Sequence, residues 1–394
     1  METSVKKQEK SALKWFASPG AVKALMLLSL LGAWMFGVLS NGQHVHEKLK
    51  TLYPESGIEK LSSDPLIYKI TDNNNAVQGY IAVSRQQGWG GPLHVATGID
   101  PAGAIRNIHV LHHRETPSFY TKLSSNLFFQ QFIGKEINAP LTVGQDVDVI
   151  TRATVSSKGF TRAIREGSHE TAINIFNLPV EEQKSVWKLG SSELVLLLLF
   201  ALIAAGHMLN QKKLRYVSMA AGLIFLGFYL NLSMSISHIS SIILGYVPIP
   251  QEYLLWWLLV IGIFLLIIVF GKNLYCSWLC PFGALQEFLG HISGMSMKIH
   301  PMLLKYGKNI ALFLTWLSMM IIFISRNPAL GNYEPFAAIF SFEGLGAVWF
   351  ILPITLLSSF FIRRFWCRFF CPVGVVLNTG CRIRNNIFKR GGSV

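Results

Sequence analysis

Charged residues are scarce in this sequence, and cysteines are absent from its first two thirds. Only 14% of the 394 residues are charged and 51% are hydrophobic, whereas an average soluble domain has roughly 25% charged residues. This composition excludes an ordinary soluble protein and predicts a membrane protein. None of the five cysteines precedes Cys276, which excludes disulfides from the N-terminal part. The later cysteines fall in pairs rather than in the framework of a secreted protein.

Long apolar runs account for most of the hydrophobic content, and each approaches the roughly 20 residues that a helix needs to cross a bilayer. The six predicted membrane spans are Ala21 to Leu39, Leu194 to Leu209, Val217 to Ser235, Tyr253 to Phe270, Ile310 to Ser325 and Leu345 to Ile362. The first run could also be a cleaved signal peptide. Its length and the lack of a clear small-residue cleavage site favour a retained anchor.

The basic residues that give the net charge of +14 are distributed according to the predicted spans. Lysines and arginines gather in alternate connections between spans, which the positive-inside rule places in the cytoplasm. They are Lys212, Lys213 and Arg215 after the second span, Lys272, Lys298 and Lys305 after the fourth, and Arg363, Arg364, Arg368, Arg382, Arg384, Lys389 and Arg390 after the sixth. Residues 236–251 contain no Lys or Arg. The charge therefore indicates topology, and we expect the lipid bilayer, not nucleic acid, as a partner.

We expect a multi-pass protein of the cytoplasmic (inner) membrane with both termini in the cytoplasm. The predicted parts are a cytoplasmic tail over residues 1–20, a transmembrane anchor over 21–41, a periplasmic or extracellular domain over 42–190, a five-helix membrane domain over 191–381 and a basic cytoplasmic tail over 382–394. The predicted fold class is thus an α/β extracytoplasmic domain followed by an all-α polytopic membrane domain.

Within residues 42–190, short β-branched and aromatic runs alternate with turn-forming clusters, which is typical of strands. The predicted strands are Ile67 to Ile70, Ala76 to Val83, His94 to Ile99 and Ile105 to Leu111, with helices over Tyr120 to Gln131 and Ser156 to Thr171. A further extended segment, Thr142 to Ile150, is predicted to lead into the second helix.

The junction between that segment and the helix carries several hydroxyl side chains. A threonine before a helix ordinarily caps it by accepting a backbone N–H. A phosphate bound at the same place would meet free N–H groups and the positive end of the helix dipole. The residues alone leave both interpretations open.

This junction resembles the attachment signal of covalent FMN-binding domains, Asp-x-x-(Ser/Thr)-Gly-Ala-Thr-x-(Ser/Thr). The matching residues are Asp148, Thr151, Ala153, Thr154 and Ser156, and Arg152 replaces the usual glycine. The resemblance implies that Thr154 carries FMN as a phosphoester and that a flavin-attaching enzyme is a partner.

Two more segments resemble that family and come in the same order along the chain. Gly88, Gly90 and Gly91 match its Gly-aromatic-Gly-Gly loop, where absent side chains would let the backbone approach a ligand. His113, Glu115 and Thr116 belong to a segment that matches its His-x-Glu-Thr-Pro motif. The resemblance implies that both segments contribute to the flavin site.

A second pattern is repeated near the ends of the fourth and sixth predicted spans. Residues 270–283 and 361–374 align without a gap at an offset of 91 residues, and each contains Cys-x-x-x-Cys-Pro followed by an apolar residue and glycine. Such a repeat implies two similar units. Cysteines four apart share one face of a helix, and proline suits the first turn of a new helix.

Two such pairs facing each other would offer four thiolates, the number that an iron–sulfur cluster or structural zinc requires. The predicted ligands are Cys276, Cys280, Cys367 and Cys371, and the residues leave the metal open. Cys381 has no counterpart in the repeat and is interpreted as a bystander. His207 and His238 are conceivable haem ligands, although isolated histidines in apolar segments are more often packed against neighbours.

The combination resembles the NosR/NirI-type membrane proteins, most closely the shorter PceC and RdhC members. That resemblance implies electron transfer across the membrane to an extracytoplasmic respiratory reductase or its maturation system. The Cys-x-x-Cys-x-x-Cys-x-x-x-Cys-Pro runs of the longer members do not occur in this sequence. We therefore expect a separate cytoplasmic donor or quinol, and a quinone is a candidate cofactor.

Two other functions remain open: a membrane-bound redox regulator or assembly factor, and a thiol relay that works through dithiols. The electron-transfer model meets one physical difficulty, since a bilayer core is roughly 30 Å thick and the charge pattern places the cysteines and the flavin on opposite sides. It requires another carrier, docking of the flavin domain onto the helices, or a cysteine centre that lies deeper than the sequence suggests.

Overall fold

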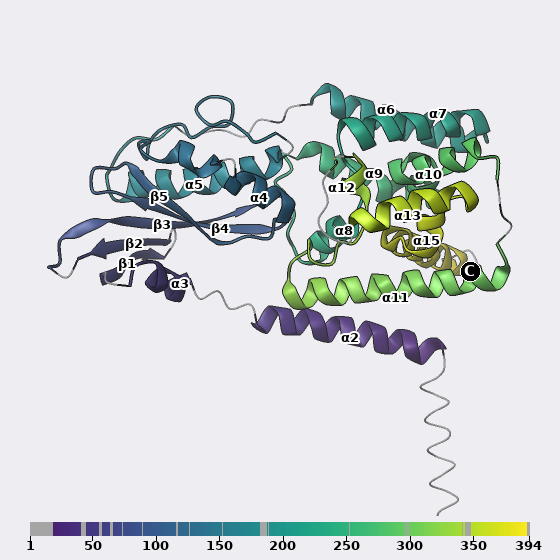
Figure 1. Ribbon diagram of the computed structural model, residues 1–394, viewed down its shortest axis with the longest axis horizontal. Coiled ribbons are helices and arrows are strands. Elements are labelled where there is room, and N and C mark those ends of the chain that lie inside the picture. The colour runs from purple at the N-terminus through teal and green to yellow at the C-terminus, as the bar shows by residue number, and fades with distance from the viewer. Residues whose placement is uncertain are drawn as a thin grey trace, which may run out of the picture.

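The chain folds into a domain built on a β-sheet, here called the sheet domain (residues 45–181), and a helical region (residues 189–391) (Figure 1). The computed structural model describes residues 19–40, 45–54, 57–63, 66–72, 74–88, 90–115, 117–125, 127–151, 153–181, 187, 189–251, 253–295, 297, 299–340, 342 and 348–391. In Figure 1 the sheet domain lies at one end of the helical region, whose long helices run along the longest axis.

Among the described residues, the sheet has five strands that pair in sequence order, and every pair is antiparallel. The strands are β1 (Gly57–Ser63), β2 (Leu66–Thr71), β3 (Val77–Gln87), β4 (Pro92–Ile99) and β5 (Ile105–His112). The turn between β4 and β5 is closed by Asp100, whose carboxylate accepts the N–H groups of Ala102 and Ala104, each at 2.9 Å. Short polar turns of this kind allow neighbouring strands to pair without crossovers.

Helices cover both faces of the sheet. On one face α5 (Thr154–Asn174) packs against β3 and β4, where Phe160 and Ile164 are fully buried against Val95. The other face carries α3 (Val45–Leu52), whose Leu49 is fully buried among residues of β2 and β3. Because both faces are covered, every residue of β4 is buried.

The sequence prediction for this domain is confirmed for four strands and for the α5 helix, which begins two residues earlier than predicted. The prediction missed β1. The predicted α/β domain is more specifically an antiparallel sheet with helices. The predicted helix over Tyr120 to Gln131 is split into α4 (Pro117–Ser125) and η1 (Phe128–Phe132), because Leu127 has a left-handed backbone conformation with φ 54°.

The predicted extended segment over Thr142 to Ile150 is interrupted, because residues 144–146 form a turn within the isolated bridge between Val143 and Val147. Its conformation is fixed by Asp146, whose carboxylate accepts the N–H groups of Leu141 at 3.0 Å and Thr142 at 2.6 Å. A side chain that satisfies backbone donors locally competes with sheet pairing.

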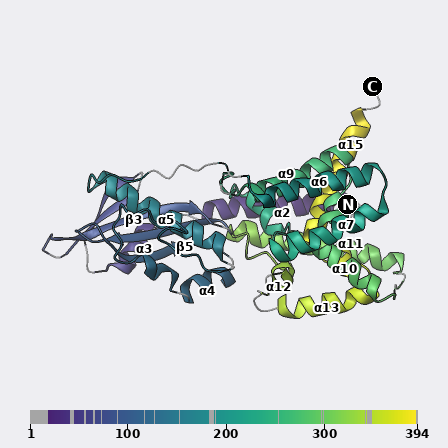
Figure 2. The same ribbon diagram turned by 90° about the horizontal axis from the view of Figure 1, so that it is seen from above.

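Short helices alternate with long ones in the helical region. They are α6 (Ser191–Met208), α7 (Lys212–Gly222), the π-helix η2 (Leu223–Tyr229), α8 (Ile236–Ile243), α9 (Leu254–Phe270), the π-helical turn η3 (Tyr275–Leu279), α10 (Pro281–Ile292), α11 (Pro301–Ser325), α12 (Phe336–Phe340), α13 (Val348–Phe361), α14 (Phe365–Phe369) and α15 (Pro372–Gly391). The N-terminal α2 (Pro19–Ser40) lies along α11 (Figures 1 and 2), where Trp316 donates a hydrogen bond to Ser29 at 3.0 Å.

Among the described residues, three helices, not six, are long and apolar enough to cross a membrane. They are Gly20–Leu39, Ser191–Met208 and Pro301–Ser325. The apolar helices α9 and α13 have only 17 and 14 residues, and a bilayer requires roughly 20. The predicted span over Val217 to Ser235 was wrong as a continuous helix, because the chain leaves the helix after η2.

The sheet domain is fixed to the helical region by polar contacts. Arg114, at the end of β5, donates a hydrogen bond to the hydroxyl of Tyr246 and lies over its ring. Arg162 of α5 donates to the hydroxyl of Tyr253 at 3.1 Å. These contacts place the first turn of α5 against the helical region.

Candidate functional site

Thr154 is the first residue of α5, and its side chain is partly exposed. The N-cap position is occupied by Ala153, which has no capping side chain. The structure therefore does not use Thr154 as the N-cap, and the first N–H groups of a helix have no intrahelical partners. A phosphate on the Thr154 hydroxyl would lie beside these donors and the positive end of the helix dipole.

Glu115 contacts both of the other predicted flavin motifs, the glycine loop and the start of α5. It is 2% exposed, it accepts a hydrogen bond from the hydroxyl of Ser156, and its other oxygen accepts the N–H of Gly90 at 3.3 Å. A Cβ on Gly88 would lie 2.0 Å from this carboxylate. The three motifs, separate in the sequence, thus form one contiguous structure.

Two glycines of the loop, Gly90 and Gly91, lie close to Arg114. A Cβ on Gly90 would lie 1.9 Å from the carbonyl oxygen of Arg114, and Gly91 has φ 145° with Arg114 beside it. Among the described residues of this loop, Gly90 alone lines the cavity described next. The approach of a ligand to the backbone of this loop stays a prediction.

A cavity of about 610 Å³ lies between the start of α5 and the helical region. Ligand cavities in proteins are typically about 300–1,000 Å³, so its volume fits a flavin-sized molecule. From the sheet domain it is lined by Gly90, Phe119, Ala153, Thr154, Val155 and Ser156. From the helical region it is lined by Phe228, Tyr229, Leu230, Asn231, Ser233, Ser235, Ser237, His238, Ser241, Ala329, Asn332, Glu334, Phe336, Ala337, Phe340 and Phe342.

The other described residues predicted for the flavin site are not among those that line this cavity. Asp148 and Thr151 are exposed, and the backbone of Asp148 is held by the side chain of Gln131. His113 stacks on Tyr120 with ring centroids 3.7 Å apart, and burial lowers the pKa of His113. Thr116 and Arg152 lie outside the described residues.

The four repeated cysteines line a second cavity of about 270 Å³ inside the helical region. Cys276 lies in η3 and Cys367 in α14, while Cys280 and Cys371 each precede the proline that begins the next helix. The pairs therefore do not share a helix face as predicted, since the residue before proline is driven out of the helical conformation. The predicted start of a new helix at each proline is confirmed.

Each of these new helices presents its N-terminus to a cysteine sulfur. The N–H of Gly374 donates to Cys371 Sγ at 3.4 Å, and a Cβ on Gly374 would lie 3.7 Å from that sulfur. In the other repeat, a Cβ on Gly283 would lie 3.8 Å from Cys280 Sγ. The Cys-Pro-x-Gly sequence thus places a cysteine sulfur at the positive end of a helix, which would stabilise a negative charge on it.

Two arginines hold the turn that carries Cys276. Arg364 donates to the carbonyl oxygens of Cys276 at 2.9 Å and Ser277 at 3.2 Å. Glu287 binds Arg364 at 2.6 Å and Arg215 at 2.7 Å. The sequence prediction counted both arginines only as topology signals, whereas the structure gives them a structural role beside the cysteines.

The donor set fits a cluster better than a single ion. Within the described part of the chain, no three His, Cys, Asp or Glu side chains are placed to share one metal ion, yet all four cysteines face one cavity. A tetrahedral zinc site needs four sulfurs about 2.3 Å from one atom. A four-iron cluster is a larger body that takes one cysteine at each iron.

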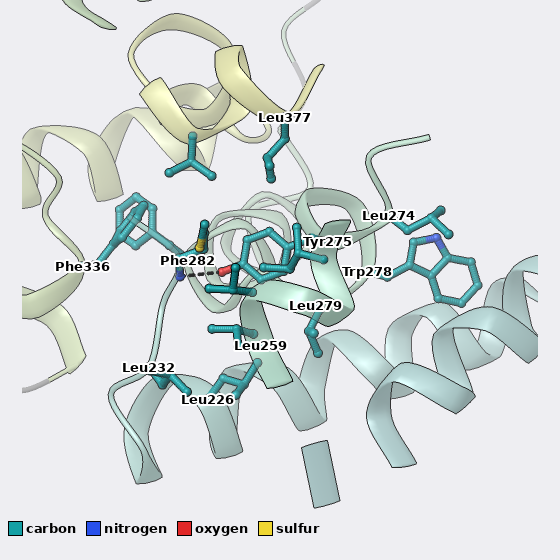
Figure 3. Packing of buried hydrophobic residues seen from close by; sticks show 14 of the residues in the cluster. Leu226, Leu232, Leu259, Leu274, Tyr275, Trp278, Leu279, Phe282, Phe336 and Leu377 are labelled. Carbon is teal, nitrogen blue, oxygen red and sulfur yellow. Dashed lines mark hydrogen bonds between the residues drawn. The ribbon is translucent and has the colours of Figure 1, made fainter. Parts of the chain in front are cut away.

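The two cavities share a wall. Phe336 lines both of them, and Met234 lines the cysteine cavity between Ser233 and Ser235, which line the other. The backbone N–H of Met234 donates to the hydroxyl of Tyr275 at 2.9 Å, shown as the dashed line in Figure 3. One layer of side chains therefore separates the cysteine cavity from the Thr154 cavity.

Two family models match this chain, and both agree with the geometry. Residues 88–168 match an FMN-binding domain, from the glycine loop to α5. Residues 253–300 and 345–391 match a 4Fe-4S binding domain, and each segment contains one Cys-x-x-x-Cys-Pro motif.

The chain is also similar to curated proteins. Protein NirI of Paracoccus denitrificans is 26% identical over 194 residues, which is 44% of this chain and 27% of that protein. The regulatory protein NosR of Pseudomonas aeruginosa is 26% identical over 192 residues, or 44% of this chain and 26% of that protein. The chain is a distant homologue of NirI and NosR.

A third relative matches a shorter part of the chain. It is a component of the proton-translocating ferredoxin:NAD(+) oxidoreductase complex of Clostridium ljungdahlii, and it is 29% identical over 98 residues, or 23% of this chain and 52% of that protein. The chain spans about a quarter of the length of the NirI and NosR relatives and about half of this one.

Sequence reasoning missed the wall that the helical region contributes to the Thr154 cavity. Ser233, Ser235 and Ser237 occupy alternate positions within an apolar stretch, and Glu334 is a lone acidic residue in a connection without lysine. Both signals were present in the sequence. His238 lines the cavity, whereas His207 packs against Phe270 and Trp278. Cys381 is buried in the apolar core of the helical region.

Proposed function

We propose that this chain is a membrane flavoprotein that transfers electrons between an iron–sulfur cluster and FMN. The cluster would be held by Cys276, Cys280, Cys367 and Cys371, and the FMN would be attached to Thr154 as a phosphoester. The observation that carries the proposal is that Phe336 lines both cavities. Two redox groups in these cavities would be separated by a single layer of side chains.

This arrangement answers the difficulty that a bilayer core poses for direct transfer. The sheet domain is docked on the helical region through Arg114 and Arg162, so the Thr154 cavity is partly built by helices. The cysteine cavity shares its wall with it. Electrons would therefore cross only a short distance between the two sites.

The residues of the chain would bind and position the groups. Thr154 would fix the phosphate at the start of α5, and Ser156 with Glu115 would hold that turn against the glycine loop. Arg364 and the N-termini of α10 and α15 would offset the negative charge of the thiolates. When bound, FMN exchanges one or two electrons, which suits a link between one-electron and two-electron carriers.

The proposal also covers the side of the membrane on which each part lies and the partners of the protein. The sheet domain would lie outside the cytoplasm, with both termini inside, as the positive-inside rule indicates. A cytoplasmic donor or quinol would supply electrons, and an extracytoplasmic reductase or its maturation system would receive them. The short PceC and RdhC proteins are the proposed subgroup, and a flavin-attaching enzyme would modify Thr154.

A regulatory function is the second candidate, since one relative is named regulatory protein NosR. There the same flavin would report redox state to a partner. A thiol relay is the third, and it requires cysteines that exchange freely with small disulfides and hold no iron.

The first experiment tests the two cofactor sites in the purified full-length protein. On a denaturing gel, flavin fluorescence should be present and should be abolished by Thr154→Ala but not by Thr121→Ala. Iron and acid-labile sulfide should fall on Cys276→Ser or Cys367→Ser and persist in Cys381→Ser. Fluorescence that survives Thr154→Ala, or zinc in place of iron, would overturn the proposed sites.

The second experiment tests transfer between the sites. Photoreduction of the flavin in the intact protein should bleach the cluster absorbance, and the bleaching should be lost in Cys367→Ser. An intact cluster that never exchanges electrons with the flavin would favour the regulatory function.

A further inference from the structure

Glu334 is a buried acidic side chain in the wall of the Thr154 cavity. It lies in the connection between α11 and α12 and is only 4% exposed. Its Oε2 accepts the N–H of Ile236, the first residue of α8, at 2.9 Å. Its Oε1 has no hydrogen-bond partner within the described part of the chain. An unsatisfied buried oxygen destabilises the folded protein, so its presence in a cavity wall points to a ligand group.

The charges around Glu334 favour its protonated form. None of the described residues that line the cavity is lysine or arginine. Burial raises the pKa of Glu334 to about 8, and the hydrogen bond from Ile236 opposes this shift. The titratable groups that face it are His238 of α8 in the same cavity wall, the neighbouring Tyr333, and Cys371 at the start of α15. Near neutral pH the side chain is therefore a carboxylic acid, which can both donate and accept a hydrogen bond.

We propose that Glu334 binds the nitrogen-containing edge of the flavin ring in this cavity and exchanges a proton with it during reduction and oxidation. The proposal rests on the proposed function, which places FMN on Thr154. Thr154 and Glu334 reach the same cavity from different parts of the chain. A ring attached through its phosphate at the start of α5 would therefore extend toward the connection that carries Glu334.

The reaction balances in electrons and protons. A bound flavin ring takes up two electrons and one proton when it is reduced to its anionic form. The electrons would come one at a time from the cluster on the far side of Phe336. Glu334 would give the proton of its carboxyl to a ring nitrogen and would be left as a carboxylate, which solvent then reprotonates. On oxidation the carboxyl would first lose its proton to solvent, and the resulting carboxylate would then accept the proton of the ring nitrogen.

The position of Glu334 links this proton to the electron path. Phe336, two residues further along the chain, lines both cavities. Ile236, which binds the other oxygen of Glu334, follows the segment that contains Met234 and forms part of the shared wall. The proton site and the electron site therefore belong to one wall of the cavity.

The test measures the midpoint potential of the protein-bound flavin against pH in the full-length protein. Below about pH 7 native protein and Glu334→Gln should have the same potential, because the native side chain is protonated. Above about pH 8 the native carboxylate has ionised, so its flavin should be harder to reduce than that of Glu334→Gln. The control Glu166→Gln removes a carboxylate of α5 that does not line the cavity, and it should follow the native curve.

Coincident curves for native protein and Glu334→Gln at every pH would overturn the proposal. If Glu334→Gln does not fold, Glu334→Asp provides the test, since a shorter carboxylate should move the change in slope to another pH. An unmoved change in slope would again contradict it. Native protein that carries no flavin on a denaturing gel would instead refute the proposed function itself, so the two failures are distinguishable.

Discussion

Arg364 lies 2.6 Å from Glu287 and uses its other amino group to bind the carbonyl oxygen of Cys276. The ion pair is largely buried, with 18% and 11% of the two side chains exposed. An arginine from one half of the cysteine repeat thus holds the cysteine turn of the other half. This contact couples the two halves around one cavity.

Replacing Arg364 by glutamine should destabilise the cysteine cavity. The change removes one partner of a mostly buried ion pair, which costs roughly 3–5 kcal/mol, and it frees the carbonyl groups of the Cys276 turn. We expect a lower iron content per protein, measured by metal analysis, and a lower thermal midpoint. Arg382→Gln, an exposed substitution on α15, is the control. Native iron content in both variants would contradict this role for Arg364.

Replacing Gly90 by alanine should unfold the flavin loop locally. The added Cβ would lie 1.9 Å from the carbonyl oxygen of Arg114, and overpacking of this kind costs roughly 1–3 kcal/mol or more. We expect loss of flavin attachment on a denaturing gel at an unchanged amount of membrane-inserted protein. Gly380→Ala, where a Cβ meets no atom within 4 Å, should behave like the native protein.

Replacing Ser156 by alanine should weaken the same site without a steric clash. It removes one hydrogen bond from the buried carboxylate of Glu115, which costs about 1–3 kcal/mol. The expected result is a lower thermal midpoint of the sheet domain. Flavin fluorescence measured during heating reports this midpoint. Ser124→Ala removes an exposed hydroxyl and should change the midpoint little. Equal midpoints for the two variants would show that the Glu115 contact carries no stability.

The sheet domain should lose stability as the pH falls below about 6.5. Burial lowers the pKa of His94 and of His112 to about 4 each, whereas an unfolded histidine titrates near 6.5. Between these values the unfolded chain binds more protons, so unfolding becomes easier as the pH falls from about 6.5 to 4. Thermal midpoints between pH 7 and pH 4 measure this loss, which His94→Phe should reduce. A midpoint that rises on acidification would contradict the argument.

Much of this protein is encoded in local sequence. The new helices after Cys280 and Cys371 follow from a short-range rule, because proline acts on its immediate neighbours. The repeat that contains the four cysteines can likewise be recognised in the sequence, because its two segments align at a fixed offset. These features required no knowledge of distant contacts.

The number of long helices and the makeup of the Thr154 cavity depend on contacts between distant residues. The predicted span ending at Ser235 breaks because Tyr275 accepts the N–H of Met234, and Glu334 accepts that of Ile236. These bonds replace helical backbone hydrogen bonds at positions where hydropathy alone predicts a membrane span.

The sequence by itself determined the two motif sets, the repeat and the apolar character of the chain. Only the tertiary structure decided that Thr154, His238 and Glu334 share one cavity and that Phe336 separates it from the cysteines. The physical reason is that a motif is set by covalent neighbours, whereas a cavity is set by packing between segments that are far apart in the chain.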